Sequence, residues 1–155
     1  SEFDIGVSFQ ALHVRGYEPY AGNIYFWGAQ TNPADSETLV AIFPIVHHLS
    51  GCIGIAASRD GVRWSSITPL IPCGTSGDRT FFQPAAPALV REPGRDDMLL
   101  LYVHEYVPGL AIDAFTPTPL YRYLDTRMPP ASVARFRFPL SLIAAWSRRA
   151  LSELS

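Results

Sequence analysis

Apolar residues fall in short runs that are separated by turn-forming residues. The runs Thr38 to His47 and Met98 to Val107 are almost continuously apolar, and each is bounded by residues that favour turns. Short runs of this kind are typical of strands that are buried on both faces. The segments Asn23 to Gly28, Thr80 to Val90 and Ser132 to Phe138 also have an extended pattern. We therefore expect a chain that is rich in β-strands.

The stretch from Gly51 to Pro69 carries the clearest local signal. Asp60-Gly61 separates two β-prone runs and favours a two-residue type I′ hairpin turn. With Arg59 opposite Val62, one face would carry the bulky apolar residues Ile53, Ile55, Ala57, Val62 and Trp64. The other face would be mostly small, with Cys52, Gly54, Ala56, Ser58, Arg63, Ser65 and Ile67. Such a sheet can be approached closely on both sides, as in stacked or radially arranged sheets.

One segment has the periodicity of an amphipathic helix. Pro139 suits a first helical turn, and the residues after it form an apolar stripe at helical spacing: Leu140, Ile143, Ala144, Leu151 and Leu154. We expect an all-β fold with a C-terminal helix, in which residues 4–138 form the β region and residues 139–155 the helix. Residues 1–3 are interpreted as a cloning scar.

The two long apolar strands begin about 60 residues apart, at Thr38 and Met98. Each follows an extended segment and a turn, and each is followed by further strands. A period of this size suits blades of four short antiparallel strands. The pattern therefore predicts part of a β-propeller, with a β-sandwich as the alternative.

The run from Cys52 to Ile71, CIGIAASRDGVRWSSITPLI, resembles the outer hairpin of a blade in the five-bladed β-propeller glycosidases. This group includes arabinanases, xylosidases, invertases and levansucrases. The residues that match its blade pattern are Ile53, Ala56, Ser58, Asp60, Gly61 and Trp64. The resemblance covers roughly residues 22–108, or about two blades of five. It implies a module that binds or hydrolyses carbohydrate, and none of the family's catalytic residues can be carried over.

Candidate residues for a carbohydrate site lie in the second apolar strand. Glycoside hydrolysis needs two carboxyl groups. Glu105 is a weak candidate for one, with Asp113 or a carboxylate outside this sequence as its partner; otherwise Glu105 is a solvated or arginine-paired residue at the strand end. His104 shares a strand face with Tyr102 and Tyr106, which would suit a sugar, although a structural histidine is the favoured interpretation of His104.

Other residues with reactive side chains have structural interpretations. Asp60 is expected to serve the turn, and the three tryptophans are expected in the core. Cys52 and Cys73 flank the hairpin, so a disulfide is geometrically conceivable, but we expect a buried free Cys52. The side chains of His47-His48 would diverge on a strand, with no cysteine or carboxylate at ligand spacing nearby. We expect no metal and no cofactor.

The composition suits one globular domain of 155 residues, with 48% hydrophobic and 17% charged residues. A net charge of −2 argues against a broad nucleic-acid surface. No apolar run is long enough to span a bilayer. The resemblance implies a secreted or extracellular protein. Two open blades would expose apolar edges, so we expect self-association, pairing with a missing part of a longer protein, or cover by the helix. The alternative function is a non-catalytic scaffold for protein–protein interaction.

Overall fold

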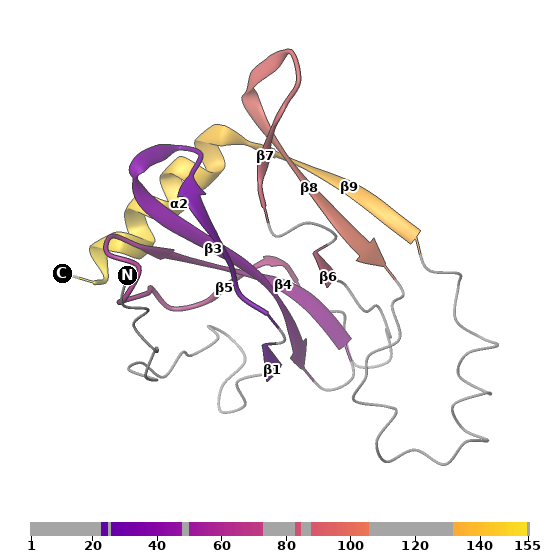
Figure 1. Ribbon diagram of the computed structural model, residues 1–155, viewed down its shortest axis with the longest axis horizontal. Coiled ribbons are helices and arrows are strands. Elements are labelled where there is room, and N and C mark those ends of the chain that lie inside the picture. Colours follow the sequence, from indigo (N-terminus) through magenta and orange to yellow (C-terminus); the bar gives the residue numbers. More distant parts are fainter. Residues whose placement is uncertain are drawn as a thin grey trace, which may run out of the picture.

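The computed structural model describes residues 23–24, 26–47, 50–72, 83–84, 88–105 and 132–154. These residues form two antiparallel β-sheets and one C-terminal helix (Figure 1). The expectation of an all-β fold with a terminal helix is therefore confirmed. Within the described residues, this helix is neither long enough nor apolar enough to cross a membrane.

The first sheet is built around one long strand, β3 (Asp35–His47). Two short strands, β1 (Asn23–Ile24) and β2 (Gly28–Asn32), pair with one side of it, and β4 (Ser50–Ser58) pairs with the other side. The last strand, β5 (Thr68–Ile71), pairs with β4. Apart from the break between β1 and β2, this is a meander of four antiparallel strands.

Pro44 lies inside β3, where the sequence predicted a bulge or an edge position. On the β4 side Pro44 is opposite Ile53, and the pairing runs through it. On the other side, pairing with β2 ends at Ile42 and pairing with β1 begins at Ile45. Because proline has no N–H group to donate, it fits the place where the neighbouring strand is interrupted.

The second sheet repeats the arrangement of the first sheet from β1 to β4, with two short strands on one side of a long strand and one strand on the other side. Its long strand is β8 (Arg95–Glu105), which begins 60 residues after β3. β6 (Gln83–Pro84) and β7 (Val90–Glu92) pair with one side of β8, and β9 (Ser132–Pro139) pairs with the other. The β7–β8 turn has the register of the β2–β3 turn, with an irregularity at the same place in each. The predicted period of about 60 residues is confirmed.

The helix α2 (Leu140–Ser152) follows β9 directly in the chain. At the equivalent point of the first sheet, after β4, the chain continues to a further strand, β5. The sequence predicted a helix over residues 139–155 with Pro139 in its first turn, but Pro139 is the last residue of β9 and the N-cap, and the helix ends at Ser152. Its buried residues are Ile143, Ser147, Ala150 and Leu151. Figure 1 shows α2 running from the end of β9 toward the first sheet. The helix packs against both β4 and β8, so it joins the two sheets.

One core lies between the two sheets. The first sheet contributes Ile42, Ile53 and Ile55, and the second contributes Leu99, Leu101 and Val103, with Ile143 of α2 among them. A polar link crosses the same interface. The side-chain amide of Gln30 donates to the carbonyl of Leu89 (3.0 Å), and its oxygen accepts from the N–H of Leu89 (2.7 Å).

The opposite face of the first sheet is also buried. This cluster includes Phe43, on which Trp27 stacks with ring centroids 4.3 Å apart. The rest of this cluster is Ala41, Ile45, Cys52, Ala56, Trp64 and Ile67. The described part of β3 from Val40 to Ile45 is thus buried on both faces, as its continuous apolarity predicted. The same prediction is wrong for β8, where Tyr102 and His104 are exposed on one face.

The predicted register of the Asp60-Gly61 hairpin is wrong. Ser58, not Arg59, pairs across the loop, and its partner is Trp64. Trp64 therefore lies on the face of Cys52 and Ala56, and Val62, which was expected beside Trp64, is 48% exposed. The cause is the Asp60 side chain, which bonds backbone N–H groups inside the loop and favours a longer turn than the two-residue one.

Candidate functional site

The loop from Ser58 to Trp64 is a closed network of hydrogen bonds. Oδ1 of Asp60 accepts from the N–H groups of Val62 (2.9 Å) and Arg63 (2.8 Å). The Ser58 hydroxyl donates to the Arg63 carbonyl (2.6 Å) and accepts from the Gly61 N–H (2.9 Å). Trp64 Nε1 donates to the Gly61 carbonyl (3.0 Å), and Gly61 has a positive φ of 76°.

This network has an electrostatic consequence for Asp60. The two backbone donors stabilise its ionised form and lower the pKa of Asp60 to about 2, from a usual value near 3.8. The carboxylate is thus occupied by its own loop. Of the residues that carry the family resemblance, Ser58, Asp60, Gly61 and Trp64 take part in this loop network, as the sequence predicted for Asp60, whereas Ile53 and Ala56 are buried in the core.

The second cluster of interest is the outer face of the second sheet. Tyr102 and His104 alternate on β8 and are both exposed, with Arg135 opposite Tyr102 and Val133 opposite His104. The structure therefore places Tyr102 and His104 on one face, as the alternation predicted. Tyr106, the third member of the predicted trio, lies outside the described residues. Neither residue lines the pocket that the structure describes, which is bordered by α2 and by Ser66 and Thr68.

Glu105 lies at the end of β8 and is partly exposed. Its Oε2 accepts a hydrogen bond from the Ser132 hydroxyl across the strand pair (3.2 Å). Asp113, its suggested partner, lies outside the described residues, as does His48 of the histidine pair. Glu105 thus has the surroundings of a solvated strand-end residue.

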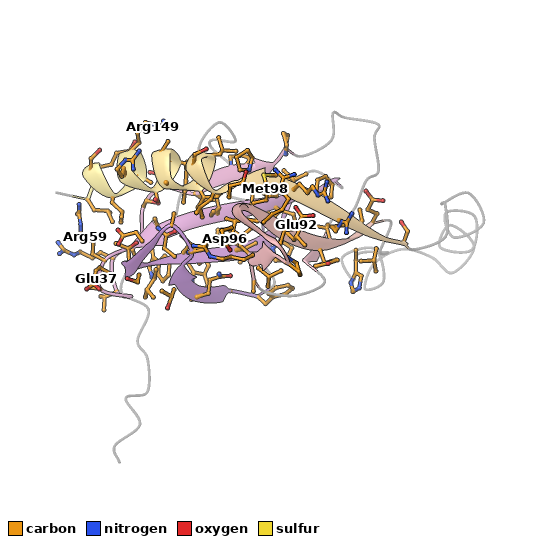
Figure 2. All side chains as sticks on the ribbon, turned by 90° about the horizontal axis from the view of Figure 1, so that it is seen from above. Glu37, Arg59, Glu92, Asp96, Met98 and Arg149 are labelled. Carbon is orange, nitrogen blue, oxygen red and sulfur yellow. The ribbon has the colours of Figure 1, made fainter. Side chains whose placement is uncertain are left out.

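A buried carboxylate that the sequence did not single out lies at the β7–β8 turn. Glu92 is 9% exposed, and its Oε1 pairs with the guanidinium of Arg137 on β9. Its Oε2 is buried with no hydrogen-bond partner in the described part of the chain. Figure 2 shows Glu92 near the middle of the molecule, whereas Glu37 and Arg59 lie at one end.

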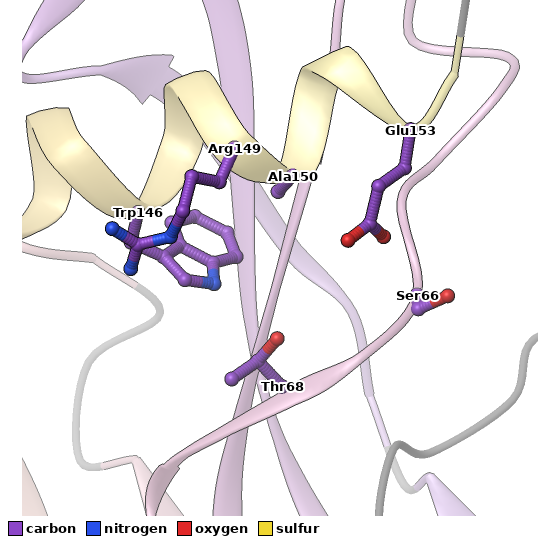
Figure 3. A pocket seen from close by; sticks show the side chains of 6 residues that line it. All are labelled: Ser66, Thr68, Trp146, Arg149, Ala150 and Glu153. Atoms are coloured by element: carbon purple, nitrogen blue, oxygen red, sulfur yellow. The ribbon is translucent and has the colours of Figure 1, made fainter.

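A pocket of about 170 Å³ lies between α2 and the strand that leads into β5 (Figure 3). The helix supplies Trp146, Arg149, Ala150 and Glu153, and the strand side supplies Ser66 and Thr68. Arg149, Ala150 and Glu153 lie three, four and seven positions after Trp146, a spacing that puts them on one face of the helix. Figure 3 shows the Arg149 guanidinium beside the indole of Trp146, with the carboxylate of Glu153 and the two hydroxyl groups around the opening.

The sequence prediction missed most of this pocket. Trp146 was assigned to the core, and it does pack against it, but one side of its ring borders the pocket. The helical spacing of Trp146, Arg149 and Glu153 could have predicted that these three residues share one face of the helix. The sequence could not predict that Ser66 and Thr68 lie opposite that face, because this depends on where α2 crosses the first sheet.

The prediction of a free Cys52 is wrong. Cys52 is buried and disulfide-bonded, and none of the described cysteines is free. The sequence has one other cysteine, Cys73, which lies outside the described residues. Trp27 and Trp64 meet edge to face at 5.0 Å, and Trp64 is buried in the core, as predicted. Across the described ranges, no three or more His, Cys, Asp or Glu side chains are grouped as metal ligands.

Comparison of the chain with protein-family models, with curated proteins and with solved structures finds no match. The site must therefore be interpreted from its own geometry.

Proposed function

We propose that the chain is a non-catalytic carbohydrate-binding module and that its binding site is the pocket between α2 and β5. The observation that carries the proposal is the convergence of one indole, one guanidinium, one carboxylate and two hydroxyl groups on a single concave site. Ligand sites are concave and combine apolar surface with a few placed polar groups. A sugar ring matches that combination, because it has an apolar C–H face and a rim of hydroxyl groups.

The size of the pocket favours a short ligand. Pockets for drug-sized molecules start at about 300 Å³, whereas this pocket measures about 170 Å³. A single sugar ring at the end of a chain is the unit that suits it. Arg149 can donate two parallel hydrogen bonds to neighbouring hydroxyl groups, and Glu153 can accept from them.

The chemistry of the pocket supports binding rather than cleavage. Glycoside hydrolysis uses a pair of carboxyl groups on the two sides of the scissile bond. Glu153 is the single carboxylate that lines the pocket, and Glu105 lies on another strand beside Ser132. This arrangement favours binding of a sugar without cleavage.

We also propose that the two sheets are consecutive blades of a propeller. Supporting this, the face of β3 that carries Ile42 packs toward the face of β8 that carries Leu99, Leu101 and Val103. In the first sheet, the residues at the equivalent positions, 60 residues earlier, lie on the face of β3 that does not carry Ile42. They are Leu39, Ala41 and Phe43. Both sheets therefore stack in the same sense, as neighbouring blades do.

The disulfide of Cys52 is consistent with an extracellular location, because disulfides persist in oxidising compartments. A scaffold for protein–protein interaction is the second candidate function. The observation that favours it is the open outer face of the second sheet, where Tyr102 is 37% and Val133 60% exposed.

The test is a titration of the protein with monosaccharides and short oligosaccharides, followed by NMR. We expect saturable binding with shifts at residues 66–68 and 146–153. Arg149→Ala should weaken binding about tenfold, since it removes a charged hydrogen-bond donor. Arg148→Ala is the matched control, because Arg148 is an exposed neighbour that does not line the pocket. Equal binding by both variants, or no saturable binding of any sugar, would refute the proposal. Shifts confined to Tyr102 and His104 would transfer the site to the outer face of β8.

A further inference from the structure

The pocket between α2 and β5 holds its two charged groups apart. Arg149 and Glu153 are four positions apart in the sequence, which is about 6 Å along a helix axis. Figure 3 shows the guanidinium of Arg149 at one end of the pocket, beside the indole of Trp146, and the carboxylate of Glu153 at the other end. Ala150 lies between them, so the pocket has a cationic end and an anionic end.

The helix brings more positive than negative charge to this wall of the pocket. Arg149 is exposed, and the ion pairs formed among the described residues involve other arginines. The preceding residue, Arg148, is also exposed, and α2 itself contains no aspartate or glutamate. An anionic group on the ligand is therefore stabilised at the Arg149 end.

A carboxylate matches the Arg149 end more closely than a hydroxyl group does. The planar guanidinium presents parallel N–H donors that fit the two oxygens of one carboxylate. Such charge-assisted hydrogen bonds are roughly twice as strong as neutral ones. The hydroxyl of Thr68, on the strand side of the pocket, can add a further donor.

The chemistry is reversed at the Glu153 end. A carboxylate accepts hydrogen bonds from hydroxyl groups and repels a second carboxylate. Figure 3 shows Ser66 on the strand side near Glu153, where its hydroxyl adds a second polar group. The pocket thus suits a ligand with a carboxylate at one end, hydroxyl groups at the other and an apolar face for the indole of Trp146.

We infer that the pocket binds a hexuronic acid at the end of a sugar chain, an inference that rests on the proposed carbohydrate binding. The C6 carboxylate pairs with Arg149, the ring lies on the indole of Trp146, and ring hydroxyl groups donate to Glu153. A neutral sugar leaves the charge of the guanidinium unmatched. An amino sugar is the rival ligand, because its ammonium group could pair with Glu153 instead.

The test compares three methyl glycosides that share one ring, those of glucuronic acid, of its methyl ester and of glucose, with the galacto series in parallel. We expect the uronate of at least one series to bind about tenfold tighter than its two neutral counterparts, because it alone forms a charged pair with Arg149. This preference should fall as the salt concentration rises, since Arg149 is exposed. Calorimetric titration measures the dissociation constants.

Two matched variants locate the preference. Arg149→Gln keeps a hydrogen-bond donor and removes the charge, so the uronate and its methyl ester should then bind within about twofold of each other. Arg148→Gln makes the same change at an exposed neighbour that does not line the pocket, and it should keep the tenfold preference.

Equal binding of the uronate and its methyl ester in both series would overturn the inference and leave the proposed function in place. So would tighter binding of methyl glucosaminide than of either uronate, or an equal loss of preference in the Arg149→Gln and Arg148→Gln variants. A lack of saturable binding for every sugar would instead refute the proposed function, and the inference with it.

Discussion

The two sheets begin with the same three-strand arrangement and end differently. The first adds β5, and its central strands are buried on both faces. The second proceeds from β9 to α2, so that β9 pairs with β8 alone among the described strands, and Tyr102 and His104 are exposed on one face. The comparison shows that the same arrangement of strands is continued by a strand in one unit and by a helix in the other.

Replacement of the fourth strand by a helix also creates the pocket. α2 crosses from the second sheet to the first, and its Trp146, Arg149 and Glu153 meet Ser66 and Thr68 there. The pocket is therefore a consequence of the difference between the two units.

The largest expected effect comes from equivalent positions in the two units. Ile42 and Tyr102 are 60 residues apart, the first fully buried and the second 37% exposed. Ile42→Ala should lower the free energy of unfolding by about 2–5 kcal/mol, because it leaves a cavity in the shared core. Tyr102→Ala should lower it by less than about 1 kcal/mol. Urea denaturation measures both, and similar losses would contradict the asymmetry of the two units.

The second prediction concerns the covalent constraint in the first sheet. Reduction of the Cys52 disulfide should lower the free energy of unfolding by roughly 2–4 kcal/mol, because the unfolded chain gains conformational freedom. Thermal unfolding with and without a phosphine reductant measures the change. A Cys52→Ser variant is the control and should not respond to the reductant.

The third prediction uses the close packing around Gly54. A Cβ atom there would lie 2.5 Å from Phe43 and 2.6 Å from Ile45, so Gly54→Ala should lower stability by roughly 1–3 kcal/mol. The comparison is Gly94→Ala at the β7–β8 turn, which meets no atom within 4 Å. Its loss should come from the positive φ alone and be about 1 kcal/mol. A larger loss at Gly94 than at Gly54 would reverse the argument.

The smallest effect is the pH dependence of the Ser58–Trp64 loop. The pKa of Asp60 is about 2 in the folded chain and near 3.8 when unperturbed, so its ionised form stabilises the fold above about pH 4. That contribution is lost as the pH falls through about 2. Asp60→Asn should show a weaker fall in stability between pH 4 and pH 2. Other carboxylates titrate there too, among them Asp97, whose pKa the neighbouring Arg95 lowers, so the difference between the two proteins is the quantity to compare.

Much of the fold could be predicted from the sequence because its signals are local. Continuous apolarity marked β3, alternation marked β9, and the Pro139 start marked α2. The register at Asp60-Gly61 could not be predicted from propensity. A two-residue turn and the observed loop use the same dipeptide, and the side-chain bonds of Asp60 and Ser58 decide between them.

The candidate site was less predictable because it depends on tertiary placement. His104 and Tyr102 share an exposed face, as alternation required, but the described pocket lies elsewhere, between α2 and β5. The pocket combines residues from strand and helix that are about 80 positions apart in the sequence, such as Thr68 and Trp146. Glu92 stood in a turn-forming segment, and its burial follows from the contact with Arg137 on another strand.

Amide hydrogen exchange followed by NMR tests most directly whether the two units differ in strand pairing. We expect continuous slow exchange from Ile53 to Ile55, where β4 is paired on both sides. We expect an alternation of slow and fast amides from Val133 to Phe138, because β9 is paired with β8 alone among the described strands. These two patterns are what the difference between the units requires. Continuous protection along β9, or alternation along β4, would contradict it.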